Sequence, residues 1–393
     1  MVDLLPLAVT VFALGLGSII ALKFKIPPLV IFLLMGLVIG TYGFLRQNEI
    51  VSFLGQLGSI LLLFAIGTEF SIYKLLRSGM VKEMGVALIE LAISMSIIFV
   101  VFAIWLPAFV ALLLALAFSI TSTGITLKLL QELNLYKKVD VPLVVKISVV
   151  EDLLTVFVFT IINSLSTAGG QPFRAALESL AISLVLFIGI SYAFYVFFNK
   201  FLFRYSIREE DVLMLAFGLL LLMVSLSGIL NLSTSFGAYL CGSIVSSWKD
   251  KWKTLDNDLR KFSYIFIAFF FLTAGLSATL HNANYLVLLL LIPFVLIVKF
   301  IGVYLGSFAA YRSSRISLFT SLGMMPRGEL TLIIVSSAVT AGLLSPIYLG
   351  MTAMVVFVIA FISYFMLRDS MRIYMYFRMK FPKLIVLGRR GFS

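Results

Sequence analysis

Cysteine, histidine and charged side chains are all scarce in this sequence of 393 residues. With one cysteine (Cys241) and one histidine (His281), the chain can form neither an internal disulfide nor a zinc site of Cys and His ligands. We interpret Cys241 as a packing residue and His281 as an interfacial one. Charged residues make up 12% of the sequence, whereas soluble proteins average about 25%. So few polar residues cannot cover a water-soluble core, and they also exclude disorder and a coiled coil. A polytopic membrane protein remains.

Apolar segments fill most of the chain, of which 62% is hydrophobic. A helix needs about 20 mostly apolar residues to cross a bilayer. Thirteen segments meet this requirement, at about 4–22, 27–45, 50–70, 84–105, 108–130, 142–163, 175–199, 211–230, 232–247, 262–280, 284–309, 314–342 and 346–367. The sequence therefore predicts an all-α polytopic membrane protein with about 13 transmembrane helices in residues 1–367, followed by a basic cytoplasmic tail at 368–393.

The basic residues are distributed unevenly between the predicted loops. Lys and Arg total 30 against 18 Asp and Glu, a net charge of +12. With the N-terminus outside, 25 of the 30 positive residues fall on the cytoplasmic side together with the C-terminus. Arg46 and Arg174 fall on the other side. This bias follows the positive-inside rule for a multi-pass protein of the cell membrane, so nucleic-acid binding is not needed to explain the charge.

A few ionisable residues lie inside the predicted spans. An ionisable group in hydrocarbon is costly, and it indicates an ion or substrate path unless it can reach the membrane surface. Lys146 lies close enough to a span end to do so. The others are Glu90, Glu151, Asp152, Lys299, Arg327 and Glu329. We look for the function among these, and the roles of Glu90 and of Glu69 stay open.

Glu151 and Asp152 form the strongest local signal. Asp152 lies ten residues into its span, about 15 Å deep and near mid-membrane. Ser148 and Thr155, four residues before it and three after it, add hydroxyls to its face of the helix. Oxygen ligands of this kind suit a small cation such as sodium. Adjacent residues on a helix do not face one partner, so Glu151 and Asp152 have different roles.

Lys299 lies near the middle of its span, too deep for its ammonium group to reach the membrane surface. A lone ammonium at that depth needs a carboxylate partner. Glu151 or Asp152, at matching depth, is the natural candidate.

Two predicted spans are interrupted. The segment at 108–130 contains a hydroxyl-rich run that includes Thr121 and Ser122, and the segment at 314–342 contains Gly323-Met-Met-Pro326-Arg327-Gly328-Glu329. Discontinuous helices at corresponding positions of two halves point to a transporter binding site. The two spans are seven apart, so they cross the membrane in opposite directions, as an inverted repeat requires. We expect Arg327 and Glu329 to pair and to brace the helices.

These residues predict the exchange of a cation for protons. Two positive species compete for one buried carboxylate, so a cation that reaches Asp152 displaces a proton. Lys299 releases its own proton when its acid partner turns toward the cation. The sequence contains no convincing P-loop, Rossmann fingerprint or catalytic triad, so we expect neither an enzyme nor a cofactor.

Seven motifs in order carry a family resemblance over nearly the whole chain. They lie at 28–40, 61–70, 121–126, 232–242, 271–276, 299–302 and 326–329. Their order and spacing resemble the second cation:proton antiporter family of the monovalent cation:proton antiporter group, which includes NapA-type sodium/proton exchangers and Kef-type potassium exchangers. In that family Asp152 matches the essential cation-binding aspartate, Glu151 the preceding acid and Lys299 the lysine that pairs with it. Thr121 and Ser122 match the polar residues at the helix break.

The resemblance also implies an architecture and a mode of transport. It implies a homodimer that moves by an elevator-like mechanism, with core helices at about 84–163 and 284–367 and dimerisation helices at about 4–70 and 175–280. Glu at position 151, where electrogenic members have Asp, keeps the charge and favours electrogenic exchange. Some members carry a cytosolic nucleotide-binding domain. Residues 384–388 read either as its first strand or, more simply, as part of a basic membrane-surface tail.

Three other functions stay open. Potassium/proton exchange is the nearest alternative to sodium/proton exchange. A cation channel would use the acids to line a continuous pore, although Lys299 and the two broken helices argue against it. A sodium-coupled solute symporter could be built on a similar inverted repeat.

Overall fold

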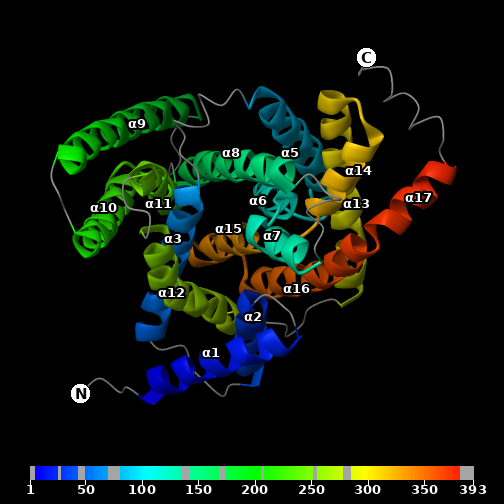
Figure 1. The fold of residues 1–393 in the computed structure, drawn as a ribbon, viewed down its shortest axis with the longest axis horizontal. Helices are drawn as coiled ribbons and strands as arrows, with labels where there is room; N and C mark the ends of the chain where they lie inside the picture. The colour runs from blue at the N-terminus through cyan, green and yellow to red at the C-terminus, as the bar shows by residue number, and fades with distance from the viewer. Residues whose placement is uncertain are drawn as a thin grey trace. The chain divides into compact units, whose positions relative to one another are not determined.

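Helices make up the protein wherever its structure is described. The structure is a computed structural model that describes residues 5–24, 28–42, 49–69, 80–133, 141–167, 173–204, 208–250, 255–277 and 285–380. The helices are α1 (Leu5–Phe24), α2 (Pro28–Tyr42), α3 (Glu49–Glu69), α5 (Val81–Phe102), α6 (Ala108–Ser119), α7 (Thr123–Glu132), α8 (Val141–Thr167), α9 (Phe173–Arg204), α10 (Glu209–Ile229), α11 (Thr234–Val245), the 3-10 helix η2 (Ser246–Asp250), α12 (Leu255–Ser277), α13 (Tyr285–Tyr311), α14 (Ser314–Gly323), α15 (Glu329–Thr340), α16 (Pro346–Arg368) and α17 (Ser370–Lys380) (Figure 1). The prediction of an all-α protein is confirmed.

Each of the thirteen predicted segments contains an α-helix within its described residues. The segments at 108–130 and 314–342 each form two short helices with a break between them, the segment at 232–247 contains α11 and the start of η2, and each of the others contains one helix. The sequence did not predict α17, which lies in the basic tail. His281 and residues 384–388 lie outside the described ranges, whereas Cys241 is buried on α11.

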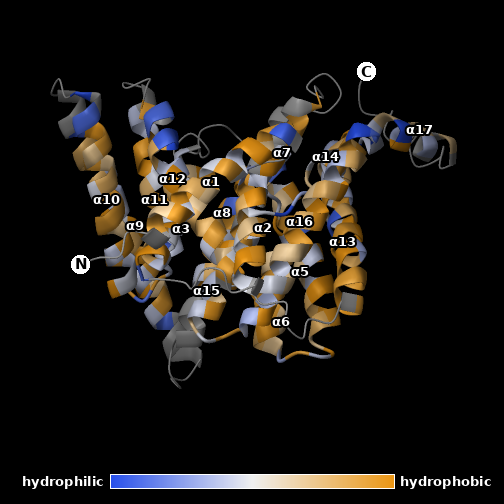
Figure 2. Ribbon diagram, turned by 90° about the horizontal axis from the view of Figure 1, so that it is seen from below, coloured by the Kyte–Doolittle hydropathy of each residue, from blue (hydrophilic) through white to orange (hydrophobic). Residues whose placement is uncertain are grey.

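Several helices are long and apolar enough to cross a bilayer. Within the described ranges there are seven: Glu49–Thr68, Val81–Phe102, Glu178–Phe198, Glu210–Ile229, Asn257–Leu276, Leu286–Tyr311 and Pro346–Arg368. Four shorter apolar helices occur as well, at Leu7–Lys23, Ile31–Gly40, Ala108–Ser119 and Leu330–Thr340. Figure 2 shows hydrophobic colour along much of α13 and α16, and hydrophilic colour on α17. The helices thus have the composition of a multi-pass membrane protein, while the number of crossings and the inverted repeat stay predictions.

Local sequence explains several helix starts. Pro346 is the first residue of α16 and Pro107 immediately precedes α6, positions where the missing N–H of proline leaves no acceptor unsatisfied. Ser313 accepts a hydrogen bond from the backbone N of Ile316 and so caps α14. Ser122 does the same for α7, through the backbone N of Ile125. Hydroxyl side chains therefore fix the first turns of two short helices that flank the candidate site.

The chain divides into two compact units. One comprises residues 1–14, 47–79 and 156–273, and the other comprises residues 15–46, 80–155 and 274–393. The second unit, which we call the polar-core unit, contains both interrupted spans and all the predicted site residues. The predicted division into core and dimerisation helices stays a prediction.

Two glycines bring α5 and α13 close together inside the polar-core unit. Gly302 and Gly306 are four residues apart on α13, the small-xxx-small spacing that lets membrane helices approach closely. A Cβ atom on Gly302 would lie 2.7 Å from Ser94 Oγ, and one on Gly306 would lie 2.9 Å from the Val86 carbonyl oxygen. Because α5 fits against these glycines, Lys299, less than one turn before Gly302, meets the same stretch of α5.

Candidate functional site

The breaks in the two interrupted spans meet and hydrogen-bond to each other. Ser122 N donates to the carbonyl oxygen of Pro326 at 2.8 Å, and Thr126 Oγ1 donates to that of Gly323 at 3.0 Å. A Cβ atom on Gly328 would lie 2.5 Å from Ser122 Oγ, so only glycine fits at this close approach. A helix break in hydrocarbon frees backbone groups that water cannot satisfy. Here residues at one break donate hydrogen bonds to backbone carbonyl groups of the other.

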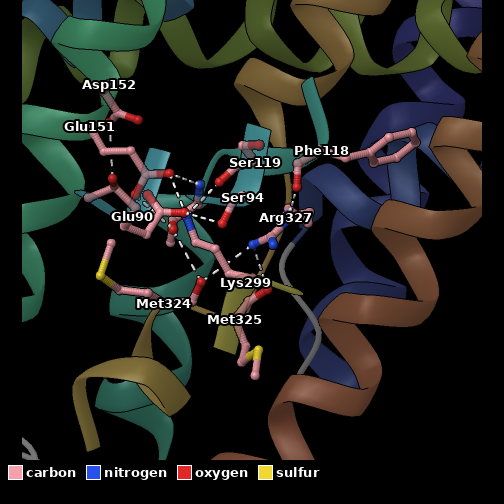
Figure 3. A network of polar contacts seen from close by, with 12 residues as sticks. Glu90, Ser94, Phe118, Ser119, Glu151, Asp152, Lys299, Met324, Met325 and Arg327 are labelled. Carbon is pink, nitrogen blue, oxygen red and sulfur yellow. Dashed lines mark hydrogen bonds and ion pairs between the residues drawn. The ribbon is translucent and has the colours of Figure 1, made fainter. Parts of the chain in front are cut away.

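Two buried basic side chains bind the carbonyl ends of the half-helices (Figure 3). Lys299 Nζ lies 2.5 Å from the carbonyl oxygen of Ser119, the last residue of α6. Arg327 Nε donates to the Phe118 carbonyl oxygen at 3.0 Å, and Arg327 Nη1 donates to the Met325 carbonyl oxygen at 3.1 Å. Helix C-termini carry partial negative charge that favours nearby cations. Both cations therefore compensate for the broken helices, and Arg327 braces them directly.

Lys299 binds two carboxylates at once. Its Nζ lies 2.7 Å from Glu151 Oε1 on α8 and 2.8 Å from Glu90 Oε1 on α5, and all three side chains are fully buried. Ser94, one turn along α5, donates a hydrogen bond to Glu90 Oε1 at 2.9 Å. A buried ion pair needs further hydrogen bonds to offset its desolvation, and this cluster supplies them.

Glu151 and Asp152 point to different partners, as their adjacent positions predict. Thr121 N donates to Glu151 Oε1 at 2.7 Å, and Thr121 Oγ1 lies 3.0 Å from Glu151 Oε2. Asp152 Oδ2 accepts a hydrogen bond from Thr123 Oγ1 at 3.0 Å, at the first residue of α7. Glu151 is thus tied to the break and to Lys299, while Asp152 lies beside the N-terminus of a half-helix.

Two hydroxyl groups on α8, Ser148 Oγ and Thr155 Oγ1, are buried without a hydrogen-bond partner among the described residues. Both lie on the Asp152 face of the helix by their spacing. Buried hydroxyls normally find a partner, so each has a free oxygen that a bound ion or water can use.

The structure brings most of the residues singled out from the sequence into one cluster and leaves a few outside it. Thr121, Glu151, Lys299 and Arg327 are linked through the breaks, and Asp152 joins through Thr123. Lys146 is half-exposed and lies 3.9 Å from Glu83. The side chains of Glu69 and Glu329 lie outside the described residues.

Sequence reasoning did not assign Glu90, Ser94 or Thr123 to the site. The signal for Glu90 was its charge inside an apolar span, and the signal for Thr123 was its place in the hydroxyl-rich run.

Comparison with known proteins places the chain in a family. The family model "Sodium/hydrogen exchanger, transmembrane" matches residues 8–368. The chain belongs to the sodium/hydrogen exchanger family. This family member is 29% identical, over 91% of its length and 95% of the relative's, to a Na⁺/H⁺ antiporter of Enterococcus hirae. It is 25% identical, over 92% of its length and 91% of the relative's, to the K⁺/H⁺ antiporter subunit KhtU of Bacillus subtilis.

A solved structure supports the fold of this family member. The sodium proton antiporter MjNhaP1 from Methanocaldococcus jannaschii superimposes with a TM-score of 0.72 at 18% identity, over 95% of this chain and 98% of the other. The predicted class of helical membrane fold is therefore confirmed.

Proposed function

We propose that the chain is a secondary active antiporter that exchanges a monovalent cation, sodium in the first place, for protons at Asp152. The observation that carries this proposal is a buried carboxylate with spare oxygen ligands beside it. Asp152 is 2% exposed, Thr123 orients one of its oxygens, and the hydroxyls of Ser148 and Thr155 on its helix face have no partner among the described residues. Carboxylate and hydroxyl oxygens are the ligands that small hard cations prefer.

Exchange follows from competition for this carboxylate. A buried anion is costly unless a positive species is bound to it, and one carboxylate in a low-dielectric site accepts either a cation or a proton. A cation that arrives from one side of the membrane therefore displaces a proton, and a proton that arrives from the other side displaces the cation. Asp152 changes its occupant while the surrounding cluster holds the two breaks together.

Alternating access moves this site between the two sides of the membrane. We propose that the interrupted spans cross at mid-membrane within two inverted repeats of a thirteen-helix protein, with the N-terminus outside and the C-terminus in the cytoplasm. Core helices at about 84–163 and 284–367 would move in an elevator-like manner against dimerisation helices at about 4–70 and 175–280 of a homodimer. Three hydrogen bonds between the breaks, from Ser122 to Pro326, from Thr126 to Gly323 and from Arg327 to Phe118, support motion of the interrupted spans as one body.

The decisive experiment replaces Asp152, the residue proposed to bind the cation and the proton in turn. Purified protein in liposomes that enclose a pH-sensitive dye is given a sodium gradient, and proton flux is recorded. Asp152→Asn keeps the shape but cannot bind a cation and a proton in turn, so we expect exchange to fall to the background of empty liposomes. Asp211→Asn is the control, because Asp211 pairs with Arg208 on the exposed start of α10. Undiminished exchange by Asp152→Asn would refute the assignment.

The same liposomes distinguish the transported cation and the class of transporter. Titration with sodium, lithium and potassium gives the apparent affinity for each, and the names of the Enterococcus and Bacillus relatives make sodium and potassium the first two ions to compare. A single-channel conductance would instead indicate a channel. Sodium-driven uptake of a solute without proton counterflow would indicate a symporter.

A further inference from the structure

Helix α17 carries large apolar side chains that are exposed. Met375, Tyr376 and Met379 expose 51%, 55% and 76% of their surfaces. Met375 and Met379 are four residues apart, so they lie on the same side of the helix. Figures 1 and 2 show α17 extending outward from the end of α16, and in Figure 2 it lies across the direction of α13. A helix in the plane of a membrane surface has this orientation relative to a membrane span.

Basic residues accompany these apolar side chains. Residues 368–380 carry a net charge of +3, because they contain one acid, Asp369, and four basic residues, Arg368, Arg372, Arg378 and Lys380. Asp369 lies 3.0 Å from Arg368 and 3.4 Å from Arg372, whose side chain is 82% exposed. A helix that combines exposed apolar and aromatic residues with basic ones has the composition of a helix that lies at the interface between a bilayer and water.

The position of α17 in the chain brings it to the lipid headgroups. The apolar helix α16 ends at Arg368 and α17 begins at Ser370, so a single residue separates the two helices. If α16 crosses the bilayer, α17 begins at the level where the headgroups lie. Anionic headgroups complement the charge of the segment, and the exposed methionines and the tyrosine ring suit the apolar boundary beneath those headgroups.

Another side of α17 contacts α14. The ring centroids of Tyr374 and Phe319 lie 5.7 Å apart, and Phe319 and Ser370 are buried. Aromatic pairs at such a separation stabilise a contact by more than their burial alone. Phe319 lies one turn before Gly323, whose carbonyl oxygen accepts the hydrogen bond from Thr126 Oγ1. Helix α17 is therefore connected through α14 to the contact between the two helix breaks.

We propose that α17 binds the anionic headgroups of the adjacent membrane leaflet and, through the contact of Tyr374 with Phe319, restrains α14 against motion relative to that surface. The proposed topology makes this the cytoplasmic leaflet, and the effect on exchange rests on the proposed elevator-like antiport. If the interrupted spans move as one body, α17 is displaced with them. Each basic residue that leaves an anionic surface weakens the binding about fivefold, so the restraint slows exchange in membranes rich in anionic lipid.

Contact with the headgroups can be measured separately from transport. The single native cysteine, Cys241, is buried, so a cysteine introduced by Met379→Cys can be labelled selectively with an environment-sensitive dye. The labelled full chain is placed in liposomes of phosphatidylcholine alone or with added phosphatidylglycerol, and each kind contains a lipid with a quencher near its headgroup. We expect quenching that increases with phosphatidylglycerol and decreases at about 1 M salt, where the Debye length is about 3 Å. Quenching that is absent, or that is independent of phosphatidylglycerol, would overturn the proposal and leave the surface to a protein partner.

Substitutions separate the charge of α17 from its contact with α14. Arg372→Gln, Arg378→Gln and Lys380→Gln together should weaken surface binding about 100-fold and remove the effect of phosphatidylglycerol on quenching. The matched control is Arg208→Gln, which removes a basic side chain that is 77% exposed at the start of α10 and should leave the quenching unchanged. Tyr374→Ala should keep the quenching but lose the effect of anionic lipid on exchange. Tyr374→Phe keeps the ring and should behave as the unmodified protein does.

The effect on transport is measured as sodium/proton exchange in the same two kinds of liposome. An anionic surface also concentrates sodium and protons, and Arg208→Gln experiences the same surface potential, so it controls for this accumulation. Added phosphatidylglycerol should slow the unmodified protein and Arg208→Gln by a larger factor than it slows the triple glutamine variant. Equal factors for all three would overturn the restraint by α17. Absence of cation-dependent proton flux in every liposome would instead refute antiport, and the quenching would still decide whether α17 binds the headgroups.

Discussion

Removal of the Lys299 ammonium should destabilise the folded protein strongly. Lys299→Met keeps most of the volume but leaves Glu90 and Glu151 buried without their shared cation. Breaking a buried pair by removing one partner costs about 3–5 kcal/mol. Glu151 keeps two hydrogen bonds from Thr121, whereas Glu90 keeps one from Ser94, so most of the loss comes from Glu90.

A second substitution tests whether the lost stability comes from the buried charge of Glu90. In the double variant Lys299→Met with Glu90→Gln, the uncompensated charge on α5 is gone, and the two substitutions should be less damaging together than their separate effects predict. Side chains in direct contact show coupling energies of about 0.5–3 kcal/mol, and a fully buried pair at 2.8 Å belongs in the upper part of that range.

The assay is reversible unfolding in mixed micelles with increasing sodium dodecyl sulfate, followed by helical circular dichroism. Lys146→Met is the matched control, because Lys146 is half-exposed and its contact to Glu83 at 3.9 Å belongs to a class of pairs worth about 0–1 kcal/mol. If Lys299→Met unfolds with the same free energy as Lys146→Met, or if the double variant is no more stable than Lys299→Met, the ion pairs of Lys299 with Glu90 and Glu151 do not stabilise the fold.

Two further predictions test the packing and the ligands of the site. Gly302→Ala places a methyl group 2.7 Å from Ser94 Oγ, so overpacking of about 1–3 kcal/mol should lower the thermal stability in detergent and slow exchange. The control Gly85→Ala, on the neighbouring helix with open space around it, should be neutral or stabilising. Equal melting temperatures for the two variants would contradict the close contact between α5 and α13. Ser148→Ala removes a hydroxyl without a partner among the described residues, so the free energy of unfolding should stay unchanged. The KM for sodium should rise about tenfold, which corresponds to the loss of a ligand worth about 1.4 kcal/mol. An unchanged KM would exclude Ser148 as a ligand.

The sequence predicted the helices well because the bilayer imposes a simple rule on each of them. A run of about 20 apolar residues is needed whatever the neighbouring helices are, so apolar content and length locate the spans without knowledge of packing. The same rule shows why α17 was missed. Residues 370–380 mix basic, aromatic and apolar side chains and have no long apolar run.

The candidate site was only partly predictable. The sequence indicated that Lys299 needs a buried acid and that Glu151 and Asp152 must have different partners. Each of these statements depends only on the sequence of a single helix, so neither needed knowledge of packing. The choice of Glu90 as a second partner depends on how α5 packs on α13, which two glycines on α13 decide. The hydrogen bond from Ser122 to Pro326 likewise depends on a tertiary contact between distant segments. Residue types identify which groups need partners, and packing decides which partners they find.

The two helix breaks form hydrogen bonds with each other, and this has a consequence for biosynthesis. Phe118 and Arg327, which join the two breaks, are 209 residues apart in the chain. At about 5–20 residues per second, a ribosome needs about 10–40 s to make the second break after the first. During that time the backbone groups around Ser122 have no partner from residues 323–328. If the interrupted spans cross the bilayer as proposed, the first span would reach its final placement only as a late step of assembly, after the second half of the chain has arrived.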